Sequence, residues 1–283
     1  MNKTATAVGQ IKTLYRENLW QGRLILVALI IILVLVVIRV SLPYTIIYSA
    51  TYWLNTQGVT AKIEDISINV NKGTFAVLGA SGSKDGLSVF NIGKASIDWK
   101  WKPLSRKTIH VKSVELEDFN LNAAQYSDAI EIAGIVIKDT GTVEDQPAED
   151  EDTVAWGASL NQIDFKDLGF CFQQFNTAYD KVSPENKHID YCGTVDLLTW
   201  QGDFSLDNAD AQNTSPGQQL TVDGTLQIKQ LSLLDNLLEG KLIEIGNTHL
   251  SNIKINGVND ITLESINIGQ LALLQKSGHP RHN

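Results

Sequence analysis

The sequence holds few of the residues that build catalytic or metal sites: two cysteines, five histidines and one methionine among 283 residues. No His-Glu-x-x-His, Gly-x-Ser-x-Gly or Walker phosphate-binding motif occurs, and Gly79–Lys84 has the spacing of a turn rather than of a phosphate-binding loop. The histidines are scattered, and no Cys-x-x-Cys pair suggests a zinc site. We therefore expect a protein that is not an enzyme and that holds no metal or other cofactor.

Positive charge is scarce beyond the first part of the chain. From Tyr44 onward there are 18 basic and 31 acidic residues, a net charge of −13, which argues against binding to nucleic acid and against electrostatic adhesion to anionic lipid headgroups. Six carboxylates gather between Glu144 and Asp152, so residues 142–153 are predicted to form a flexible, solvated acidic loop. Calcium binding is the alternative, but the glycine and the alternating ligands of an EF-hand loop are missing.

One long apolar run stands out in this otherwise polar chain. All fifteen residues from Leu24 to Ile38 are apolar, and the run extended to Leu42 is long enough to cross about 30 Å of hydrocarbon. The alternative is a core helix of a soluble protein, which in a domain of this size would keep a polar face toward solvent, and this segment has no polar face. The sequence therefore predicts a single transmembrane helix over residues 23–43.

The residues that flank this run predict its orientation. Four basic residues precede it against one acidic residue, so residues 1–22 are expected to form a cytoplasmic tail. The helix is predicted to continue past Pro43 as a membrane-proximal helix over residues 44–58. The residues expected at the membrane interfaces are Trp20, Arg23, Arg39, Tyr44, Tyr48, Tyr52 and Trp53. A cleaved signal peptide is the alternative, but Tyr48-Ser49-Ala50 lies too far beyond the apolar run for a cleavage site.

The two cysteines, Cys171 and Cys192, both fall in the part predicted to be exported. In an oxidising compartment a disulfide between them would stabilise the fold by about 3 kcal/mol in the chain-entropy model. We predict this disulfide, which would fasten a helical or looped excursion to a sheet; two buried free thiols are the alternative.

The region from residue 59 to 283 is predicted to be mainly β. Apolar residues recur in pairs of the form apolar-x-apolar, and two polar or small residues separate one pair from the next. In a regular strand consecutive pairs would lie on opposite faces, and a bulge or kink brings them back to one face. The longest examples are Ala61, Ile63, Ile66 and Ile68; Ile109, Val111, Val114, Leu116, Phe119 and Leu121; and Ile261, Leu263, Ile266, Ile268, Leu271 and Leu273. We expect a curved, mostly antiparallel sheet, groove-like or taco-like, with one continuous apolar surface and a few short helices.

Turns and one short helix are predicted between these strands. The turn signals are Asn71–Gly73, Gly79–Gly86, Asp223-Gly224 and Asn256-Gly257. A helix is expected over Leu231–Glu239, with four leucines on one side and Gly240 as its end.

The order of these features resembles the AsmA-like proteins of the Gram-negative envelope. An anchor with a cytoplasmic N-terminus is followed by Leu42-Pro43 and then by Leu54–Gly58, which precedes the first strand. The remaining matching segments are the strand pair Ile66–Leu78 with Gly73 in its turn, Phe90–Ala95, Ile97–Trp99, Pro103-Leu104, Ile109–Leu121, and the Ile-Gly pairs at 245–246 and 268–269. The chain is short for this family, which fits either a small member or part of a longer protein.

The resemblance implies a sheet bent into an open groove with an apolar inner face, in a protein anchored in the bacterial inner membrane with its bulk in the periplasm. Larger relatives are thought to conduct phospholipids, so inner-membrane lipid and a phospholipid ligand are the expected partners. The residues expected to contact acyl chains are Ile63, Ile66, Ile68, Phe75, Val77, Ile97 and Trp99. A filled apolar core is the alternative to a groove. The alternative function is a structural or assembly factor of the cell envelope, whose sheet edges bind envelope proteins.

Overall fold

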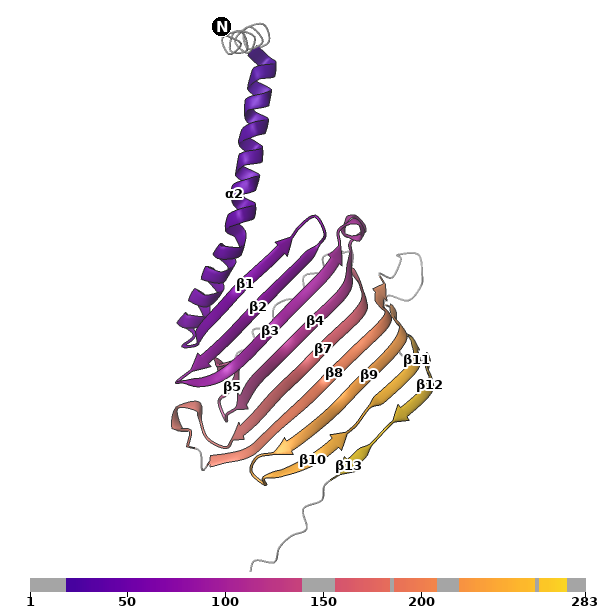
Figure 1. The fold of residues 1–283 in the computed structure, drawn as a ribbon. Helices are drawn as coiled ribbons and strands as arrows, with labels where there is room; N and C mark the ends of the chain where they lie inside the picture. The colour runs from indigo at the N-terminus through magenta and orange to yellow at the C-terminus, as the bar shows by residue number, and fades with distance from the viewer. Residues whose placement is uncertain (1–18, 139–155, 184–185, 208–218, 258–259, 274–283) are drawn as a thin grey trace, which may run out of the picture. The chain divides into compact units, whose positions relative to one another are not determined.

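The computed structural model describes residues 19–138, 156–183, 186–207, 219–257 and 260–273 (Figure 1). The chain forms two compact units, Met1–Tyr48 and Ser49–Asn283. The acidic loop predicted near residues 142–153 and most of the predicted tail 1–22 lie outside the described residues.

Helix α2 (Leu19–Thr56) is one continuous helix over the predicted transmembrane and membrane-proximal segments. The part from Arg23 to Thr56 is long and apolar enough to span a membrane, and the large apolar side chains from Leu24 to Ile38 are 48% to 64% exposed. Pro43 does not end the helix, and the hydroxyl of Thr45, two residues after it, donates a hydrogen bond to the Ser41 carbonyl at 3.0 Å. The chain leaves the helix at Gly58, whose φ of +80° suits the left-handed residue of a helix C-terminus.

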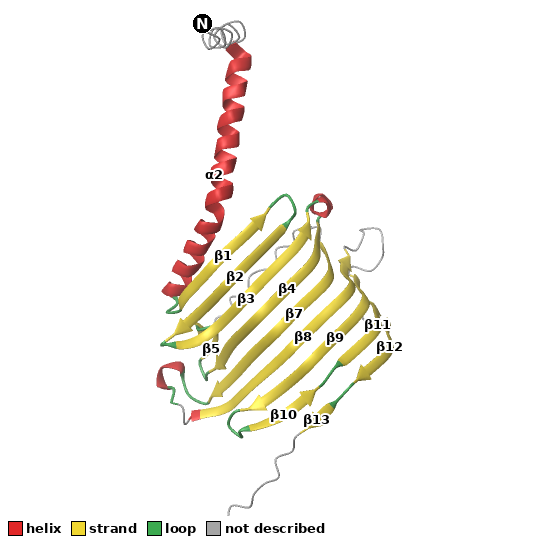
Figure 2. Cartoon of the chain, in the orientation of Figure 1, coloured by secondary structure: helices red, strands yellow, loops and turns green. Residues whose placement is uncertain are grey.

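The thirteen described strands form one curved, unclosed sheet (Figures 1 and 2). Their bounds are β1 Thr60–Asn69, β2 Thr74–Lys84, β3 Leu87–Lys100, β4 Thr108–Gln125, β5 Ala129–Ile132, β6 Ile135–Lys138, β7 Gly157–Phe175, β8 Lys187–Asp207, β9 Gln219–Asp235, β10 Gly240–Ile245, β11 Thr248–Asn256, β12 Asp260–Ile268 and β13 Leu271–Leu273. The predicted mainly β fold is confirmed. Neighbouring strands are antiparallel except β4 and β7, which are parallel. The two described short helices are 3-10 helices, η1 (Lys102–Arg106) and η2 (Tyr179–Lys181).

The strand order is β1-β2-β3-β4-β7-β8-β9, after which β10 and β11 lie one after the other along β9. In the same way, β13 pairs with β10 and β12 pairs with β11. The short hairpin of β5 and β6 pairs with the last residues of β4.

The register places apolar residues on one face of the whole sheet, because residues that face each other across strands lie on the same side. One row of paired residues consists of Ile68, Phe75, Ile97, Val114, Ile163, Trp200, Leu226, Leu250 and Ile266. A second row consists of Ile63, Ala80, Ile92, Phe119, Leu168, Val195, Leu231, Ile245 and Leu271. We call this side the apolar face.

The residues that alternate with these apolar residues along each strand form a polar face. One of its rows runs through Ser67, Ala76, Ser96, Glu115, Asp164, Thr199, Gln227, His249 and Asn267. Charged side chains of this face pair with one another, as Lys94 Nζ does with Glu115 Oε2 at 2.6 Å. The predicted one-sided apolar surface is therefore present in the sheet.

A line of kinks crosses the strands and brings successive apolar pairs to the same face. Gly79 of β2, Asp118 of β4, Asp167 of β7 and Gln230 of β9 all have φ between +48° and +59°. Asp118 and Asp167 face each other directly on β4 and β7, because the flanking pairs are in register on both sides. By the same register, β3 separates Gly79 from Asp118 and β8 separates Asp167 from Gln230. A left-handed residue reverses the alternation of a strand, so Leu116 and Phe119 lie on one face although they are three residues apart.

The helix predicted over Leu231–Glu239 is wrong. Leu231 and Leu233 belong to β9, where they pair with Ile245 and Ile243 of β10. A tight turn follows, in which the Asp235 carboxylate accepts hydrogen bonds from the backbone of Leu237 and Leu238. Leu233 and Leu234 at the end of β9 and Leu237 and Leu238 in the turn have a spacing that is close to helical, which explains the error.

Two predicted turns also lie inside strands. Most of Gly79–Gly86 belongs to β2, and the turn is confined to Asp85 and Gly86. Asp223-Gly224 lies within β9, where Gly224 leaves room for the ring of Trp200. The turns at Asn71–Gly73 and Asn256-Gly257 are confirmed.

Candidate functional site

The residues predicted to contact acyl chains are brought together on the apolar face of β1, β2 and β3. Ile68, Phe75 and Ile97 face one another across these strands, and Ile66 faces Val77. The remaining two are Ile63, opposite Ala80, and Trp99, opposite Val111. The sequence pattern therefore identified one surface, and its contact with lipid stays a prediction.

Ile66 differs from the other residues of this group. Its side chain is only 4% exposed, so it supports its neighbours and offers almost no surface to a ligand. Trp99 is half-buried and packs edge-to-face on Trp101, with ring centroids 5.2 Å apart.

The apolar face is hollowed where the kink line crosses β4, β7, β8 and β9. The hollow has a volume of about 360 Å³, within the range of about 300–1,000 Å³ usual for small-ligand sites. Its lining residues are mostly apolar: Phe119, Leu168, Gly169, Phe170, Gly193, Thr194, Val195, Leu231, Ser232, Leu233 and Ile243. None of them was singled out from the sequence as a contact residue, although the apolar spacing that places them was recognised in β4 and β9.

The apolar face is not covered by a second sheet, because all thirteen strands of the described residues belong to one sheet. Large apolar side chains remain accessible on it, including Phe170 at 46% and Ile109 at 45%. An exposed apolar surface of this extent is typical of a binding surface rather than of the outside of a soluble domain.

The polar face carries ion pairs that suit contact with water. Lys166 lies between Glu117 at 3.1 Å and Asp164 at 3.7 Å. The hydrogen bond from Lys94 lowers the pKa of the Glu115 carboxyl below its usual value, so this pair stays charged at neutral pH. The two faces thus differ sharply in what they can bind.

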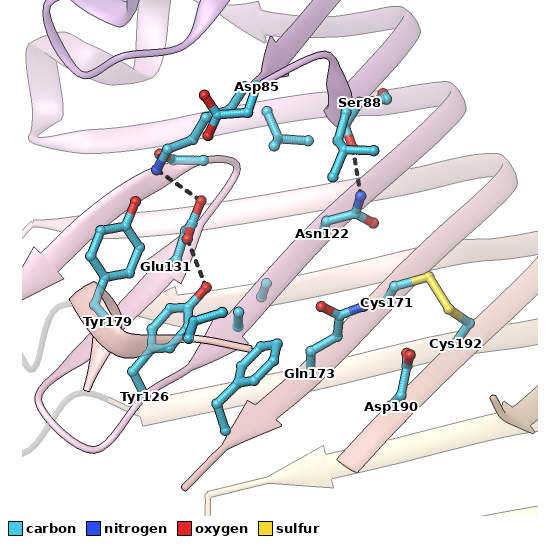
Figure 3. A pocket seen from close by; sticks show the side chains of 18 of the residues that line it. Asp85, Ser88, Asn122, Tyr126, Glu131, Cys171, Gln173, Tyr179, Asp190 and Cys192 are labelled. Atoms are coloured by element: carbon cyan, nitrogen blue, oxygen red, sulfur yellow. Dashed lines mark hydrogen bonds and ion pairs between the residues drawn. A yellow bond between two sulfur atoms is a disulfide. The ribbon is translucent and has the colours of Figure 1, made fainter. Parts of the chain in front are cut away.

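A recess of about 750 Å³ lies on the polar face at one end of β4, β7 and β8 (Figure 3). Lys84 Nζ lies 3.0 Å from Glu131 Oε1, and the Tyr126 hydroxyl donates to the other oxygen of Glu131 at 3.0 Å. Burial raises the pKa of the Tyr126 phenol, and the hydrogen bond to Glu131 adds to this effect. The Lys84 ammonium also lies 5.2 Å from the ring centre of Tyr179. These contacts join the β5–β6 hairpin to β2 and to the loop after β7.

The predicted disulfide is confirmed and contributes to the floor of this recess. Cys171 and Cys192 face each other in register on β7 and β8. The bond joins two strands that already pair with each other, and four further residue pairs separate it from the loop that contains η2. It therefore links strand to strand, and the prediction that it fastens a helical or looped excursion to the sheet is wrong. The Asn236 side-chain amide lies 3.3 Å from the Cys192 sulfur.

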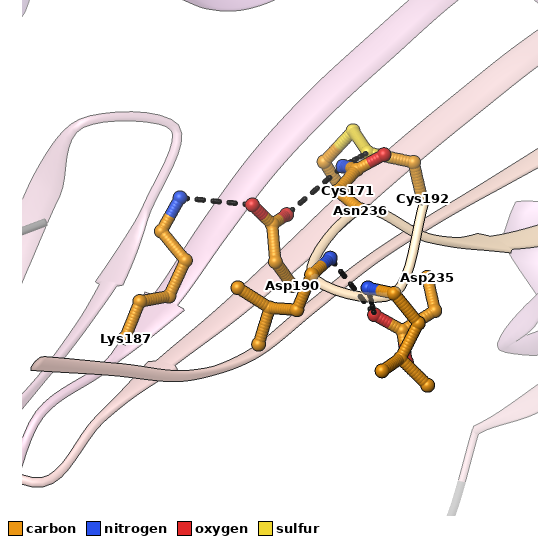
Figure 4. Close-up of polar contacts among 8 residues, drawn as sticks. Cys171, Lys187, Asp190, Cys192, Asp235 and Asn236 are labelled. Atoms are coloured by element: carbon orange, nitrogen blue, oxygen red, sulfur yellow. Dashed lines mark hydrogen bonds and ion pairs between the residues drawn. A yellow bond between two sulfur atoms is a disulfide. The ribbon is translucent and has the colours of Figure 1, made fainter. Parts of the chain in front are cut away.

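Asp190 lies beside the disulfide and is almost fully buried (Figure 4). Its carboxylate accepts hydrogen bonds from Lys187 at 2.8 Å and from Asn236 at 3.0 Å. Burial alone would raise the pKa of Asp190, but these hydrogen bonds outweigh it and lower the pKa below the usual value. Both carboxylate oxygens of Asp190 thus have a partner within the fold, and this cluster holds the β9–β10 turn in place.

The residues predicted at the membrane interfaces all lie on helix α2. Tyr44, Tyr48 and Tyr52 follow one another at intervals of four residues and are 62% to 72% exposed, and Trp53 is 52% exposed. This spacing places the three tyrosines on one side of the helix. Their position at an interface, like that of Trp20, Arg23 and Arg39, stays a prediction.

No group of three or more histidine, cysteine, aspartate or glutamate side chains within the described ranges could hold a metal ion. In comparisons with known proteins, no family model and no curated protein matches this chain.

Proposed function

We propose that this chain is a membrane-anchored protein of the bacterial cell envelope that shelters phospholipid acyl chains on its apolar face. In this proposal α2 spans the inner membrane with residues 1–22 in the cytoplasm, and the sheet lies in the periplasm. The activity is lipid transport or lipid homeostasis without catalysis, as the resemblance to AsmA-like proteins implies.

The observation that carries the proposal is the continuous apolar face of a sheet that has no second layer in the described residues. In water such a surface would be unfavourable by roughly 25 cal/mol for each Å² left exposed. Acyl chains can cover it without forming directional contacts, and the hollow around Phe119 and Leu168 offers a place for them.

Three further observations support it. The polar face carries paired charges and suits water, so only the apolar face suits the acyl chains of a lipid. The net charge of −13 beyond residue 43 disfavours binding to an anionic bilayer surface, which leaves the acyl chains as the part of the lipid to be recognised. The disulfide is typical of an oxidising compartment such as the periplasm.

Native mass spectrometry of the full chain, extracted gently in detergent, tests the proposal. The wild-type protein should retain phospholipid. A Leu168→Gln variant, changed in the hollow, should lose most of it. The matched control is Leu78→Gln, because Leu78 lies on the polar face, in the row of Asp65 and Lys94. Absence of phospholipid from the wild type, or equal retention by the two variants, would contradict the proposal.

A further inference from the structure

One edge of the sheet has no further strand beside it within the described residues. Strand β12 pairs with β11 alone, so the backbone groups along its outer side have no strand partner among the described residues. All nine residues of β12 are exposed, including Ile261 at 67% and Ile266 at 59%. The strand contains no proline and no lysine, which are common protection of natural edge strands, although Asp260 and Glu264 lie along it.

The opposite edge, β1, is different. It has the same apolar spacing, but Lys62, Glu64 and Asp65 lie along it. One of its apolar residues, Ile66, is buried, whereas every apolar residue of β12 is open to solvent. Both edges carry acidic residues, but only β1 also has a lysine and a buried apolar residue, so β12 is the more open of the two to a further strand.

The kinks indicate which strand would fit this edge. In each antiparallel pair at a kink, a strand with a left-handed residue lies beside a strand without one. Gly79 of β2 faces Glu64 of β1, and Asp167 of β7 faces Asp196 of β8. On β11, Asn252 has φ of +49° and faces Glu264 of β12, whose own φ is not positive.

By the same rule, a strand that adds antiparallel to the outer side of β12 needs a left-handed residue opposite Glu264. Three strands of this sheet that have one follow a common pattern: apolar-x-apolar-x, then Asp or Gln, then apolar-x-apolar. The matching segments are 114–121 of β4, 163–170 of β7 and 226–233 of β9. Asp, Asn and Gly are also the residues that adopt this conformation most readily.

We propose that the β12 edge binds an extended segment of a partner protein that has this pattern, in antiparallel orientation and with its apolar side chains continuing the apolar face. Backbone hydrogen bonds would supply the affinity and the alternating side chains the specificity. A second copy of this chain does not meet the requirement with any described edge strand, because β1, β6, β12 and β13 contain no left-handed residue. The inference is independent of lipid binding.

A peptide experiment tests this. The probe is a fluorescently labelled peptide with the sequence of Val114–Leu121. The control peptide differs only in having valine at the position of Asp118. Both are titrated with the full chain in detergent micelles, and binding is followed by fluorescence anisotropy. We expect the valine peptide to bind about tenfold more weakly, because a β-branched residue resists the left-handed conformation.

Protein variants locate the site. Ile266→Lys, on the open edge, should reduce binding of the aspartate peptide at least about tenfold, because lysine disfavours strand addition. Ala61→Lys, on the opposite edge, is the matched control and should leave binding unchanged. Equal binding of the two peptides, or unchanged binding to Ile266→Lys, would overturn the proposal. So would concentration-dependent self-association of the wild type that Ile266→Lys abolishes, which would identify a second copy as the occupant.

Discussion

The kink line makes a quantitative prediction at Asp167, which has φ of +52° and an exposed side chain in the middle of β7. A left-handed conformation costs an ordinary L-residue about 1–2 kcal/mol, and it costs glycine nothing. Glycine also loses about 0.5–1 kcal/mol through its greater freedom in the unfolded chain. Asp167→Gly should therefore change the free energy of unfolding by less than about 1 kcal/mol.

Asp167→Val should be less stable than Asp167→Gly by about 1–2 kcal/mol, because valine is β-branched and resists this backbone conformation. Asp196 provides the matched control: it faces Asp167 on β8 and is exposed, but its φ is not positive. There valine should be more stable than glycine, by up to about 1 kcal/mol, as in an ordinary strand.

Urea unfolding of the full chain in detergent, followed by tryptophan fluorescence and far-UV circular dichroism, measures these differences. The prediction is the reversal of order between the two sites. If valine is at least as stable as glycine at position 167, the left-handed kink is absent and the argument for a single apolar face loses its basis.

Three further predictions concern the polar recess. Replacing both Cys171 and Cys192 with serine should lower the free energy of unfolding by about 3 kcal/mol, as measured by urea titration without reductant, and the wild type in reductant should match the double variant. Because the pKa of Asp190 is lowered, its charge stabilises the fold above the ordinary aspartate pKa of about 3.9, and this stability is lost as the pH falls through the folded value. The difference in unfolding free energy between wild type and Asp190→Asn should thus shrink from pH 7 to pH 3. A difference independent of pH would refute this. Glu131→Gln should destabilise the protein by about 2 kcal/mol in thermal or urea unfolding at pH 7, because Lys84 loses its charged partner in a half-buried site, and an unchanged midpoint would contradict that role.

The sequence predicted which residues share the apolar face better than it predicted where the strands are kinked. The spacing of Val114, Leu116, Phe119 and Leu121 correctly required a kink to keep these residues on one side. It did not reveal that the kinked residue is Asp118, because an aspartate in a left-handed conformation looks in the sequence like any exposed polar residue.

The remaining errors concern a strand end and glycines within strands. Leucine pairs at the end of β9 and in the turn after it resemble the period of a helix, which led to the wrong helix at Leu231–Glu239. Glycines within strands, such as Gly79 and Gly224, were taken for turns although each makes room for a side chain of a neighbouring strand.

The recess could not be predicted, because it depends on contacts between residues far apart in the chain. Lys84 and Glu131 are 47 residues apart and meet only because the β5–β6 hairpin folds back along β4. The disulfide was within reach of the sequence, since only one pairing of two cysteines exists.

Photo-crosslinking in membranes tests most directly whether the apolar face holds acyl chains. A photoreactive amino acid is placed at Phe170 on the apolar face or at Leu78 on the polar face, which are 46% and 37% exposed, respectively. We expect phospholipid adducts, identified by mass spectrometry, at position 170 and few or none at position 78. Equal labelling at the two positions, or no lipid adduct at position 170, would contradict the account.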